Sequence, residues 1–369
     1  MKALEDLHIG FIGLGNMGGA VAEGLVRAGI PAEQLYACGG HFDKLTVRCQ
    51  EISKLAQSNV RKTHGSTSAA SVVANVSSSS TGSALAGDFN PSTDSALAGD
   101  FNSGTGSALA GDFNPGTGSA LAGDFNPGTD SALAGDFSSS TDSTSESATR
   151  SLNTAGIHAC RDAADVAASA DLIFIAIKPG KIPAVLKPIS AHFAHKIVVS
   201  LAWGYDLSRY EKEEIFPDTT HLLCTIPNTP VSVCKGIFVT EKTSTLTDEE
   251  QALVQALLEK ISLVIPVETA QLNIGGIIGG CAPAFAEVFM EALADAAVMY
   301  GIPRATAYPL VSKMLEGTAA LQLASGKHPA AMKDDVCSPG GATIRGIASL
   351  EEHAFRGTVI DAVKAIQGE

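Results

Sequence analysis

The chain has 369 residues, a formal net charge of −14 and an isoelectric point near 5.1. That length allows two or three domains with a sizeable core. The acidic balance argues against nucleic acid or an anionic membrane surface as a partner. We therefore expect neither partner, although a local basic pocket for a phosphate stays compatible with this charge.

The seven cysteines form no C-x-x-C pair and show no His/Cys spacing typical of metal ligands. This usage predicts reduced thiols, no metal site and a cytoplasmic location. Glu5 and Asp6 stand where a signal peptide would need basic residues. No apolar run reaches the expected length of a membrane span.

The first predicted element is a short apolar strand that ends in a glycine-rich turn. Gly13, Gly15 and Gly18 complete a G-x-G-x-x-G pattern, and a segment of helical periodicity follows. This order is the context that a dinucleotide-binding fingerprint needs. The first glycine permits the tight turn, the second lets backbone N–H groups approach a pyrophosphate, and the third lets the helix pack closely on the strand. An ordinary strand–helix turn is the alternative, but the context favours nucleotide binding.

A second strand is expected from Gln34 to Cys38, where the residue closing the strand selects the cofactor. An acid there would hold the ribose 2′-OH of NAD, and an Arg nearby would accept the 2′-phosphate of NADP. The strand instead ends Cys38-Gly39-Gly40-His41. On the helix expected over 43–57, Lys44 and Arg48 either supply positive charge or are only solvated. NADP is favoured because no acid repels the extra phosphate, with NAD as the alternative.

From Lys62 to Arg150 the composition changes to Ser, Thr, Gly, Ala and Asn. The unit Ser83-Ala-Leu-Ala-Gly-Asp-Phe-Asn90 recurs there with a period of twelve residues. Each unit has one Leu and one Phe, which bury too little apolar area to offset the entropy of ordering. We predict a disordered insertion over 62–150, and an interaction or assembly tract is the alternative.

Strands and helices alternate again after the insertion. Strands are expected at 156–159, 171–177, 196–202, 221–226, 237–239 and 263–267, and helices at 163–170, 182–193 and 247–260. The continuously apolar runs among them are typical of strands buried on both faces of a parallel sheet. The pattern predicts an α/β fold with a Rossmann-like doubly wound sheet. Because ligands bind at the carboxyl ends of such strands, Gly13, Lys178 and residues 202–204 are expected to converge on one crevice.

The C-terminal part is predicted to be helical. Small residues and wide apolar faces over 285–300 and 305–324 favour contact between subunits. A further helix is expected to begin near Ala342, after Ser338-Pro339-Gly340-Gly341. Its free N–H groups are suited to a substrate carboxylate, and Thr343 adds a hydroxyl. A plain Pro-Gly connector is the alternative that composition alone favours.

Five stretches carry a resemblance to a known family. They are Phe11 to Gly19, Ala176-Ile-Lys-Pro179, Pro227-Asn-Thr-Pro230, Glu291-Ala-Leu-Ala-Asp-Ala296 and His328 to Phe355. On these motifs the chain resembles pyrroline-5-carboxylate reductase over nearly its whole length except the insertion. The last motif, with its Ser-Pro-Gly-Gly-x-Thr-Ile pattern, is highly specific.

The resemblance implies a Rossmann dinucleotide-binding domain over 1–61 and 151–267 and an all-α dimerisation and substrate domain over 268–369. It also implies a homodimer or larger homo-oligomer with a small-molecule substrate. The implied reaction is hydride transfer from NAD(P)H to 1-pyrroline-5-carboxylate, which gives L-proline in the last step of proline biosynthesis. Neither a metal nor a covalent nucleophile is required.

Site residues carried over by motif fall into two sets. The resemblance implies cofactor contacts for Gly13, Gly15, Asn16, Met17, Ala176, Lys178, Pro179, Ala202, Gly204 and Asn228. It implies substrate contacts for Gly341, Ala342 and Thr343, with a catalytic role for Thr343.

The chain departs from the family pattern at three places. Cys224 replaces the usual Arg, Trp203 replaces a small residue, and Gly279-Gly-Cys-Ala-Pro283 replaces Ser-Gly-Ser-Gly-Pro. Two alternatives therefore stay open: a catalytically impaired relative that acts as a binding or oligomeric scaffold, and a reductase of a related cyclic imine or a β-hydroxyacid.

Overall fold

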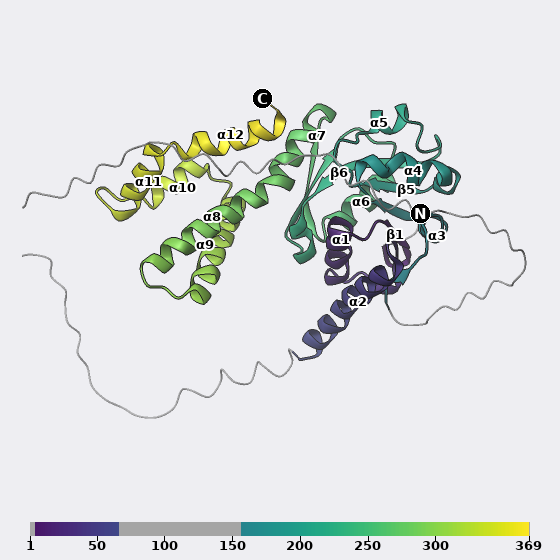
Figure 1. Ribbon diagram of the computed structural model, residues 1–369, viewed down its shortest axis with the longest axis horizontal. Coiled ribbons are helices and arrows are strands. Elements are labelled where there is room, and N and C mark those ends of the chain that lie inside the picture. The colour runs from purple at the N-terminus through teal and green to yellow at the C-terminus, as the bar shows by residue number, and fades with distance from the viewer. Residues whose placement is uncertain (1–3, 66–155, 369) are drawn as a thin grey trace, which may run out of the picture. The chain divides into compact units, whose positions relative to one another are not determined.

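The computed structural model describes residues 4–65 and 156–368 (Figure 1). The predicted insertion over 62–150 lies outside the described residues except for its first four positions, which continue a helix. The described residues belong to one compact unit.

One mixed sheet forms the centre of the N-terminal part of this unit (Figure 1). Its strands are β1 Ile9–Ile12, β2 Leu35–Cys38, β3 His158–Ala159, β4 Leu172–Ile175, β5 Ile197–Ser200, β6 His221–Pro227, β7 Gly236–Glu241 and β8 Ser262–Val267. The spatial order is β3-β2-β1-β4-β5-β6-β7-β8. The first six strands are parallel and have the Rossmann order, which confirms the predicted fold class. β7 runs antiparallel to β6, and β8 pairs in parallel with β7.

Helices accompany this sheet. They are α1 Asn16–Arg27, α2 Phe42–Gly65, α3 Ala163–Ser169, α4 Ile182–Leu186, α5 Leu207–Lys212 and α6 Asp248–Leu258. Alternate residues of each central strand face opposite sides, so Phe174 belongs to one buried cluster and Ile175 to the other. The Phe11 and Phe174 rings stack in the first cluster with centroids 5.1 Å apart. Burial on both faces explains why these strands read as unbroken apolar runs.

One predicted helix is interrupted. The expected helix over 182–193 is α4 followed by a 3-10 segment, Lys187–Phe193. Pro188 explains the change, because a proline ring removes an N–H donor and clashes with the preceding helical turn. The structure also extends α2 to Gly65, beyond the expected end near Gln57.

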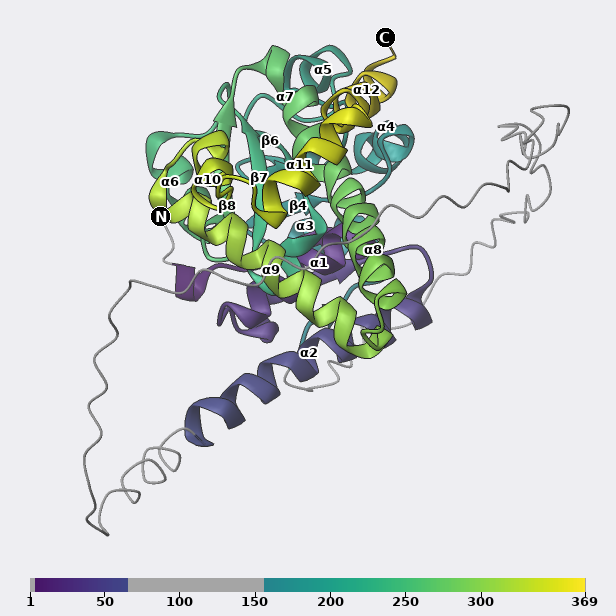
Figure 2. The ribbon, with the colours of Figure 1, turned by 90° about the vertical axis from the view of Figure 1, so that its left-hand side faces the viewer.

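The C-terminal part is helical, as predicted. It contains α7 Thr269–Gly276, a π-helix at Ile277–Cys281, α8 Ala282–Met299, α9 Arg304–Ser325, α10 Pro329–Asp335, α11 Ala342–Glu352 and α12 Phe355–Gln367. Helices α8 and α9 lie side by side (Figures 1 and 2) around a small core of Ala294, Ala307 and Val311. Helices α10, α11 and α12 contain no buried residue.

The expectation that no apolar run reaches membrane-spanning length needs correction. The helical stretch Thr269–Met299 is long and apolar enough to cross a membrane by length and composition, and 17% of its most apolar window is buried. Its charged residues are spaced widely enough to leave such a window. A single helix of this kind does not distinguish a membrane span from a helix that packs against protein.

Candidate functional site

The turn after β1 requires glycine at two of its three predicted positions. Gly13 has φ +102°, and a Cβ atom there would lie 2.6 Å from the Ala176 carbonyl oxygen. A Cβ atom on Gly18 would lie 2.1 Å from the Gly13 carbonyl oxygen. The predicted tight turn and the predicted close packing of helix on strand are therefore confirmed.

Gly15 differs from the other two glycines. A Cβ atom built there would meet nothing within 4 Å, so the protein itself leaves room for a side chain. Gly15 is the N-cap of α1 and provides no side-chain cap for the first N–H groups of that helix. Those groups and the positive end of the helix dipole form an anion-binding position.

A crevice of about 740 Å³ opens where β1 to β4 end, and we call it the strand-end crevice. Its lining comes from the glycine turn, the loop after β2, the start of α2, the residues after β3 and the segment after β4. The main chain keeps these strand ends together, since Gly13 N donates to Cys38 O at 3.0 Å and Ala176 N donates to Ile12 O at 2.9 Å. Gly13, Gly15, Asn16 and Lys178 line the crevice as predicted.

Positive charge gathers in the strand-end crevice although the whole chain is acidic. The cationic lining residues are Lys44, Arg48, Arg161, Lys178 and Lys181, and the carboxylate among the lining residues is Asp162. An anionic ligand would therefore be attracted to this crevice in particular. Sequence reasoning missed Arg161 and Lys181. The strand-end rule could have identified Arg161, because that residue follows the third strand.

The thiol that closes β2 contributes no charge to this crevice. Burial raises the pKa of Cys38 to about 12. The neighbouring thiol of Cys160 is also shifted by burial, to a pKa of about 11. Both thiols are therefore protonated at neutral pH, and the position where an acid would select NAD stays neutral.

The predicted substrate segment has the expected local form. Gly340 has φ +67°, Gly341 is the N-cap of α11 without a side-chain cap, and the helix begins at Ala342. Thr343 is exposed in the first turn. Arg345 Nη1 donates to Gly340 O at 3.1 Å and braces the turn. Among the described residues, none of α11 lines the strand-end crevice.

Comparison with known proteins identifies the family. The sequence pattern described as "Pyrroline-5-carboxylate reductase dimerisation" matches residues 269–368, and "NADP oxidoreductase coenzyme F420-dependent" matches residues 8–88 and 127–204. Pyrroline-5-carboxylate reductase of Treponema pallidum (strain Nichols) is 45% identical over 214 residues, which make up 57% of this chain and 80% of that relative. The chain belongs to the pyrroline-5-carboxylate reductase family.

Other proteins of this family are similar to the chain in sequence or in fold. The Escherichia coli (strain K12) enzyme of the same name is 36% identical over 209 residues, covering 56% of this chain and 77% of the relative. The solved pyrroline carboxylate reductase of Plasmodium falciparum with NADP bound is similar in fold, with a TM-score of 0.61, 21% identity and coverage of 98% of this chain and 95% of that one. The Coxiella burnetii structure gives a TM-score of 0.62 at 20% identity, with 97% and 95% covered.

This family member has a separate hollow after β5. Trp203 and Gly204 line a space of about 300 Å³ together with residues of α7, and neither lines the strand-end crevice. The expected convergence therefore holds for Gly13 and Lys178 but not for Gly204. The Trp203 ring lies against Gly276 at the side of this hollow, where a Cβ atom on the glycine would come within 2.9 Å of the ring.

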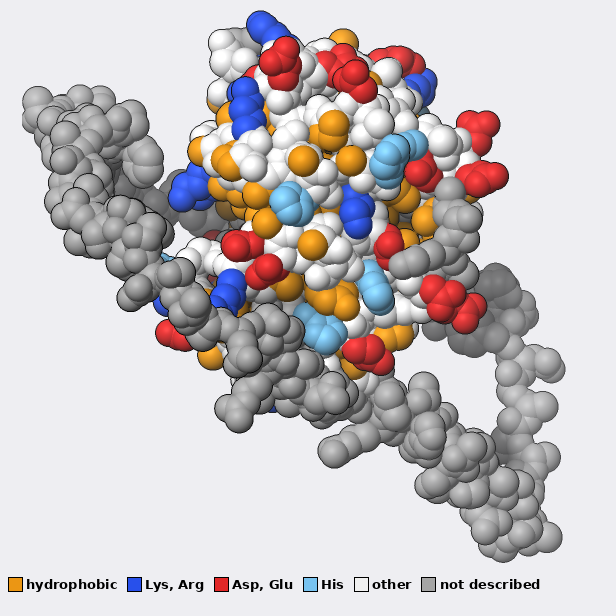
Figure 3. All heavy atoms as spheres, turned by 90° about the vertical axis from the view of Figure 1, so that its right-hand side faces the viewer, with side chains coloured by type: hydrophobic (Ala, Val, Ile, Leu, Met, Phe, Trp, Pro, Cys, Tyr) orange, Lys and Arg blue, Asp and Glu red, His pale blue; other side chains and the backbone are white. Residues whose placement is uncertain are grey.

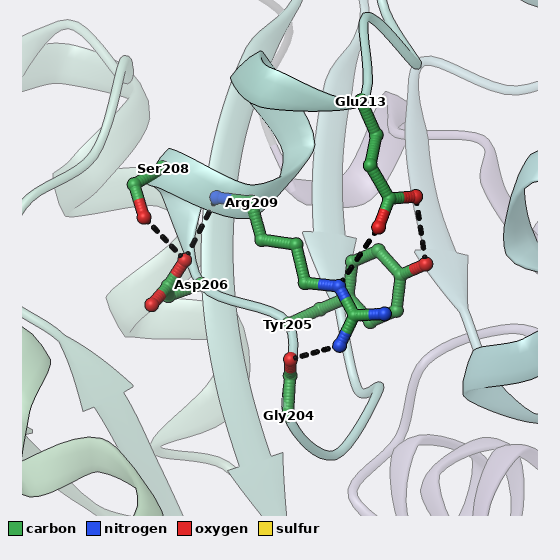
Figure 4. Close-up of polar contacts among 6 residues, drawn as sticks. All are labelled: Gly204, Tyr205, Asp206, Ser208, Arg209 and Glu213. Atoms are coloured by element: carbon green, nitrogen blue, oxygen red, sulfur yellow. Dashed lines mark hydrogen bonds and ion pairs between the residues drawn. The ribbon is translucent and has the colours of Figure 1, made fainter.

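The turn that carries Gly204 is tightly held (Figure 4). Arg209 Nη1 donates to Gly204 O at 2.8 Å, and its guanidinium lies 3.9 Å above the centre of the Tyr205 ring. Glu213 accepts hydrogen bonds from Arg209 Nε and from the Tyr205 hydroxyl, both at 2.9 Å. The hydrogen bond from Arg209 lowers the pKa of Glu213. Asp206 caps α5 by accepting from the Arg209 N–H at 2.8 Å.

Asn228 is occupied within the protein. Its side-chain amide donates to Gly279 O at 3.0 Å and accepts from Ile237 N at 2.9 Å, and the residue is 5% exposed. These bonds tie the end of β6 to β7 and to the π-helix. The cofactor contact that the motif implies for Asn228 stays a prediction.

The remaining predicted contacts are partly buried or buried. Met17 and Ala176 pack against the core cluster of β1, Pro179 is partly buried at the start of a 3-10 turn, and Ala202 is 3% exposed. Backbone atoms are what such positions can offer to a ligand. Within residues 4–65 and 156–368, no group of three or more His, Cys, Asp or Glu side chains is arranged to hold a metal ion.

Proposed function

We propose that this protein reduces 1-pyrroline-5-carboxylate to L-proline with NADPH, the last step of proline biosynthesis. The observation that carries the proposal is the 45% identity to a relative named pyrroline-5-carboxylate reductase, over 80% of that relative's length. In this proposal the strand-end crevice binds the cofactor and the helix start at α11 binds the substrate.

The residues of the strand-end crevice fit a nicotinamide dinucleotide. The uncapped start of α1 and the free space at Gly15 suit a pyrophosphate, and Asn16 and Lys178 lie beside it. The cofactor, when bound, supplies the hydride. The excess of cationic side chains in the crevice and the neutral Cys38 thiol favour NADP over NAD.

The α11 start fits the substrate. A pyrroline carboxylate carries a negative charge, and the N–H groups of Ala342 and Thr343 lie at a helix N-terminus preceded by a glycine turn. In this proposal the hydroxyl of Thr343, which is exposed in the first turn of α11, bonds the ring nitrogen or the carboxylate. A protonated imine is already electrophilic, so the protein mainly positions two partners and excludes water.

We propose that a second copy of the chain completes this site. Among the described residues, none of the substrate segment at 338–345 lines the strand-end crevice. The family pattern that matches residues 269–368 is named for dimerisation, so a homodimer or larger homo-oligomer is expected. All seven cysteines are free, and a cytoplasmic location is part of the proposal.

One observation favours a second candidate, a catalytically impaired family member that keeps the oligomeric scaffold. Trp203 is 36% exposed and its ring fills space beside α7 where the family pattern has a small residue. The π-helix at Ile277–Cys281 contains the altered Gly-Gly-Cys sequence. A changed shape at this place is also compatible with a related cyclic imine as the substrate.

The test is turnover by the purified full chain. We expect loss of NADPH absorbance that depends on 1-pyrroline-5-carboxylate, with L-proline identified by chromatography in equal amount. Gly15→Val is the control for contaminating reductases, because it blocks the crevice in the same preparation. An oligomer that binds NADPH but forms no proline would favour the scaffold, and turnover restricted to other cyclic imines would change the substrate.

A further inference from the structure

A cation stands at the end of β3, directly beside the place where β2 lacks its acid. β3 pairs with β2 in parallel, with Tyr36 opposite His158 and Ala37 opposite Ala159. The ladder continues through Cys160, whose N–H donates to Ala37 O at 2.8 Å. Arg161 is the next residue, so it leaves the sheet next to the glycines that follow β2.

Space for a ligand group exists at this position. Gly39 and Gly40 line the strand-end crevice together with Arg161 and Lys44. A Cβ atom on Gly40 would meet nothing within 4 Å, and one on Gly39 would meet its nearest atom at 3.7 Å. Neither glycine is required for packing here, so the loop after β2 leaves the crevice open beside the cations.

Arg161 and Lys44 are the available cations at this end of the crevice. Arg48, one turn further along α2, forms ion pairs with Glu23 and Glu51. Within residues 4–65 and 156–368, by contrast, no carboxylate lies within salt-bridge distance of Arg161 or Lys44. Both side chains are exposed to the crevice.

The nearest acid is already used by the fold. Asp162 follows Arg161 and caps α3 by accepting the Asp165 N–H at 2.9 Å. Among the described residues, no ion pair joins this carboxylate to Arg161 or Lys44.

We propose that Arg161, assisted by Lys44, binds the 2′-phosphate of NADP(H) and sets the preference for NADP over NAD. This assignment rests on the proposed function, which places a nicotinamide dinucleotide in the strand-end crevice. A guanidinium offers paired donors that match two phosphate oxygens, and Lys44 adds a point charge from the facing helix. The selectivity signal thus comes from the third strand and not from the second.

The test measures binding and does not depend on turnover. Calorimetry compares 2′,5′-ADP with 5′-AMP, and NADPH with NADH, on the full chain and on Arg161→Gln. We expect Arg161→Gln to weaken 2′,5′-ADP and NADPH by about 10- to 150-fold, the range for a charge-assisted hydrogen bond. Binding of 5′-AMP and NADH should change by less than about twofold.

Three further variants sharpen the result. Lys44→Gln should show the same selectivity with a smaller loss, and Arg161→Lys should retain part of it. Lys54→Gln removes a charge from an exposed position of α2 outside the crevice and should leave all four affinities unchanged. The assignment would be overturned if Arg161→Gln weakened 2′,5′-ADP and 5′-AMP binding equally, and NADPH and NADH binding equally. No loss of affinity for any of the four would also overturn it.

Failure of the two proposals can be told apart. A protein that forms no proline but binds 2′,5′-ADP more tightly than 5′-AMP through Arg161 would contradict the proposed reaction and support the phosphate site. Proline formation with equal binding of the two fragments would keep the reaction and remove the phosphate site.

Discussion

The sheet region and the helical region of this protein differ in how much of their apolar surface is buried. Every residue of β1 and β4 is buried, and two large clusters fill both sides of the sheet. On the face of the sheet region in Figure 3, hydrophobic side chains are interspersed with charged and histidine side chains. In α8 to α12 the buried core consists of three residues, while Met299, Leu323 and Val288 are 81%, 70% and 67% exposed. The sheet region completes its own core, whereas the helical region presents exposed apolar surface, which a second copy of the chain would cover in the proposed oligomer.

The difference between the two regions is tested most directly at the exposed apolar surface of the helical region. Leu321 and Leu323 are 61% and 70% exposed on α9. We expect the double change Leu321→Glu and Leu323→Glu to give monomers, because carboxylates buried in an interface cost several kcal/mol, or more than about 1,000-fold in association. Light scattering after size exclusion measures the mass, and proline formation should fall with it.

Val47→Glu is the matched control in the sheet region, since Val47 is 54% exposed on α2 and does not line the strand-end crevice. It should leave mass and activity unchanged. A stable oligomer in the double variant would show that α9 does not form the interface.

The next largest effect is expected at the substrate segment of the helical region. Thr343→Ala removes a hydroxyl from the first turn of α11 and keeps the helix start. If that hydroxyl orients the imine, kcat/KM for the imine should fall by about 10- to 100-fold, and the affinity for NADPH should not change. Thr343→Ser, which keeps the hydroxyl, should restore most of the activity. Unchanged kcat/KM in Thr343→Ala would show that Thr343 only occupies the helix start and does not orient the substrate.

The cofactor side belongs to the sheet region, where Gly15→Val tests it. A Cβ atom at Gly15 meets no protein atom within 4 Å, so the variant should fold normally. Its side chain would occupy the path to the α1 N-terminus and weaken NADPH binding by at least about tenfold. Calorimetric titration measures the affinity, and thermal unfolding confirms the fold. If this variant bound NADPH as tightly as the wild type, the pyrophosphate would not bind at this turn.

Alkaline pH should weaken the sheet region specifically. Burial raises the pKa of Cys49 to about 12, above the value near 8.5 expected in an unfolded chain. The folded state then holds a proton that the unfolded state loses, so stability is complete below about pH 8.5 and falls as the pH rises toward 12. The free energy of unfolding should fall by up to about 1.4 kcal/mol per pH unit for such a thiol. Urea titrations at pH 8 to 11 on Cys49→Ala should show a shallower fall, and Cys337→Ala should match wild type.

The smallest effect is expected from shortening the repeat segment. Joining Arg61 directly to Ser151 removes a tract whose composition predicts no buried core, and loop entropy depends only weakly on length. Oligomer mass, thermal stability and proline formation should stay near their wild-type values. Aggregation or loss of the oligomer would show that the tract has a structural role.

Much of the site in the sheet region could be predicted from local sequence. The glycine spacing predicted both the tight turn at Gly13 and the close packing of the helix at Gly18, because the absence of a Cβ atom has the same consequence wherever a strand meets a helix in this way. The Pro-Gly-Gly sequence likewise predicted a helix that begins near Ala342, and α11 begins there. A proline rule applied to Pro188 would have predicted the break after α4 as well.

What the sequence by itself determined is the set of elements and the family motifs, since these depend on side-chain periodicity, glycine positions and spacing. Only the tertiary structure decided that β7 runs antiparallel to β6, that Trp203 and Gly204 line a separate hollow, and that Arg161 lies beside the end of β2. These features depend on which strands become neighbours and which side chains then compete for the same space. Local sequence does not contain that information, because the residues involved are far apart along the chain.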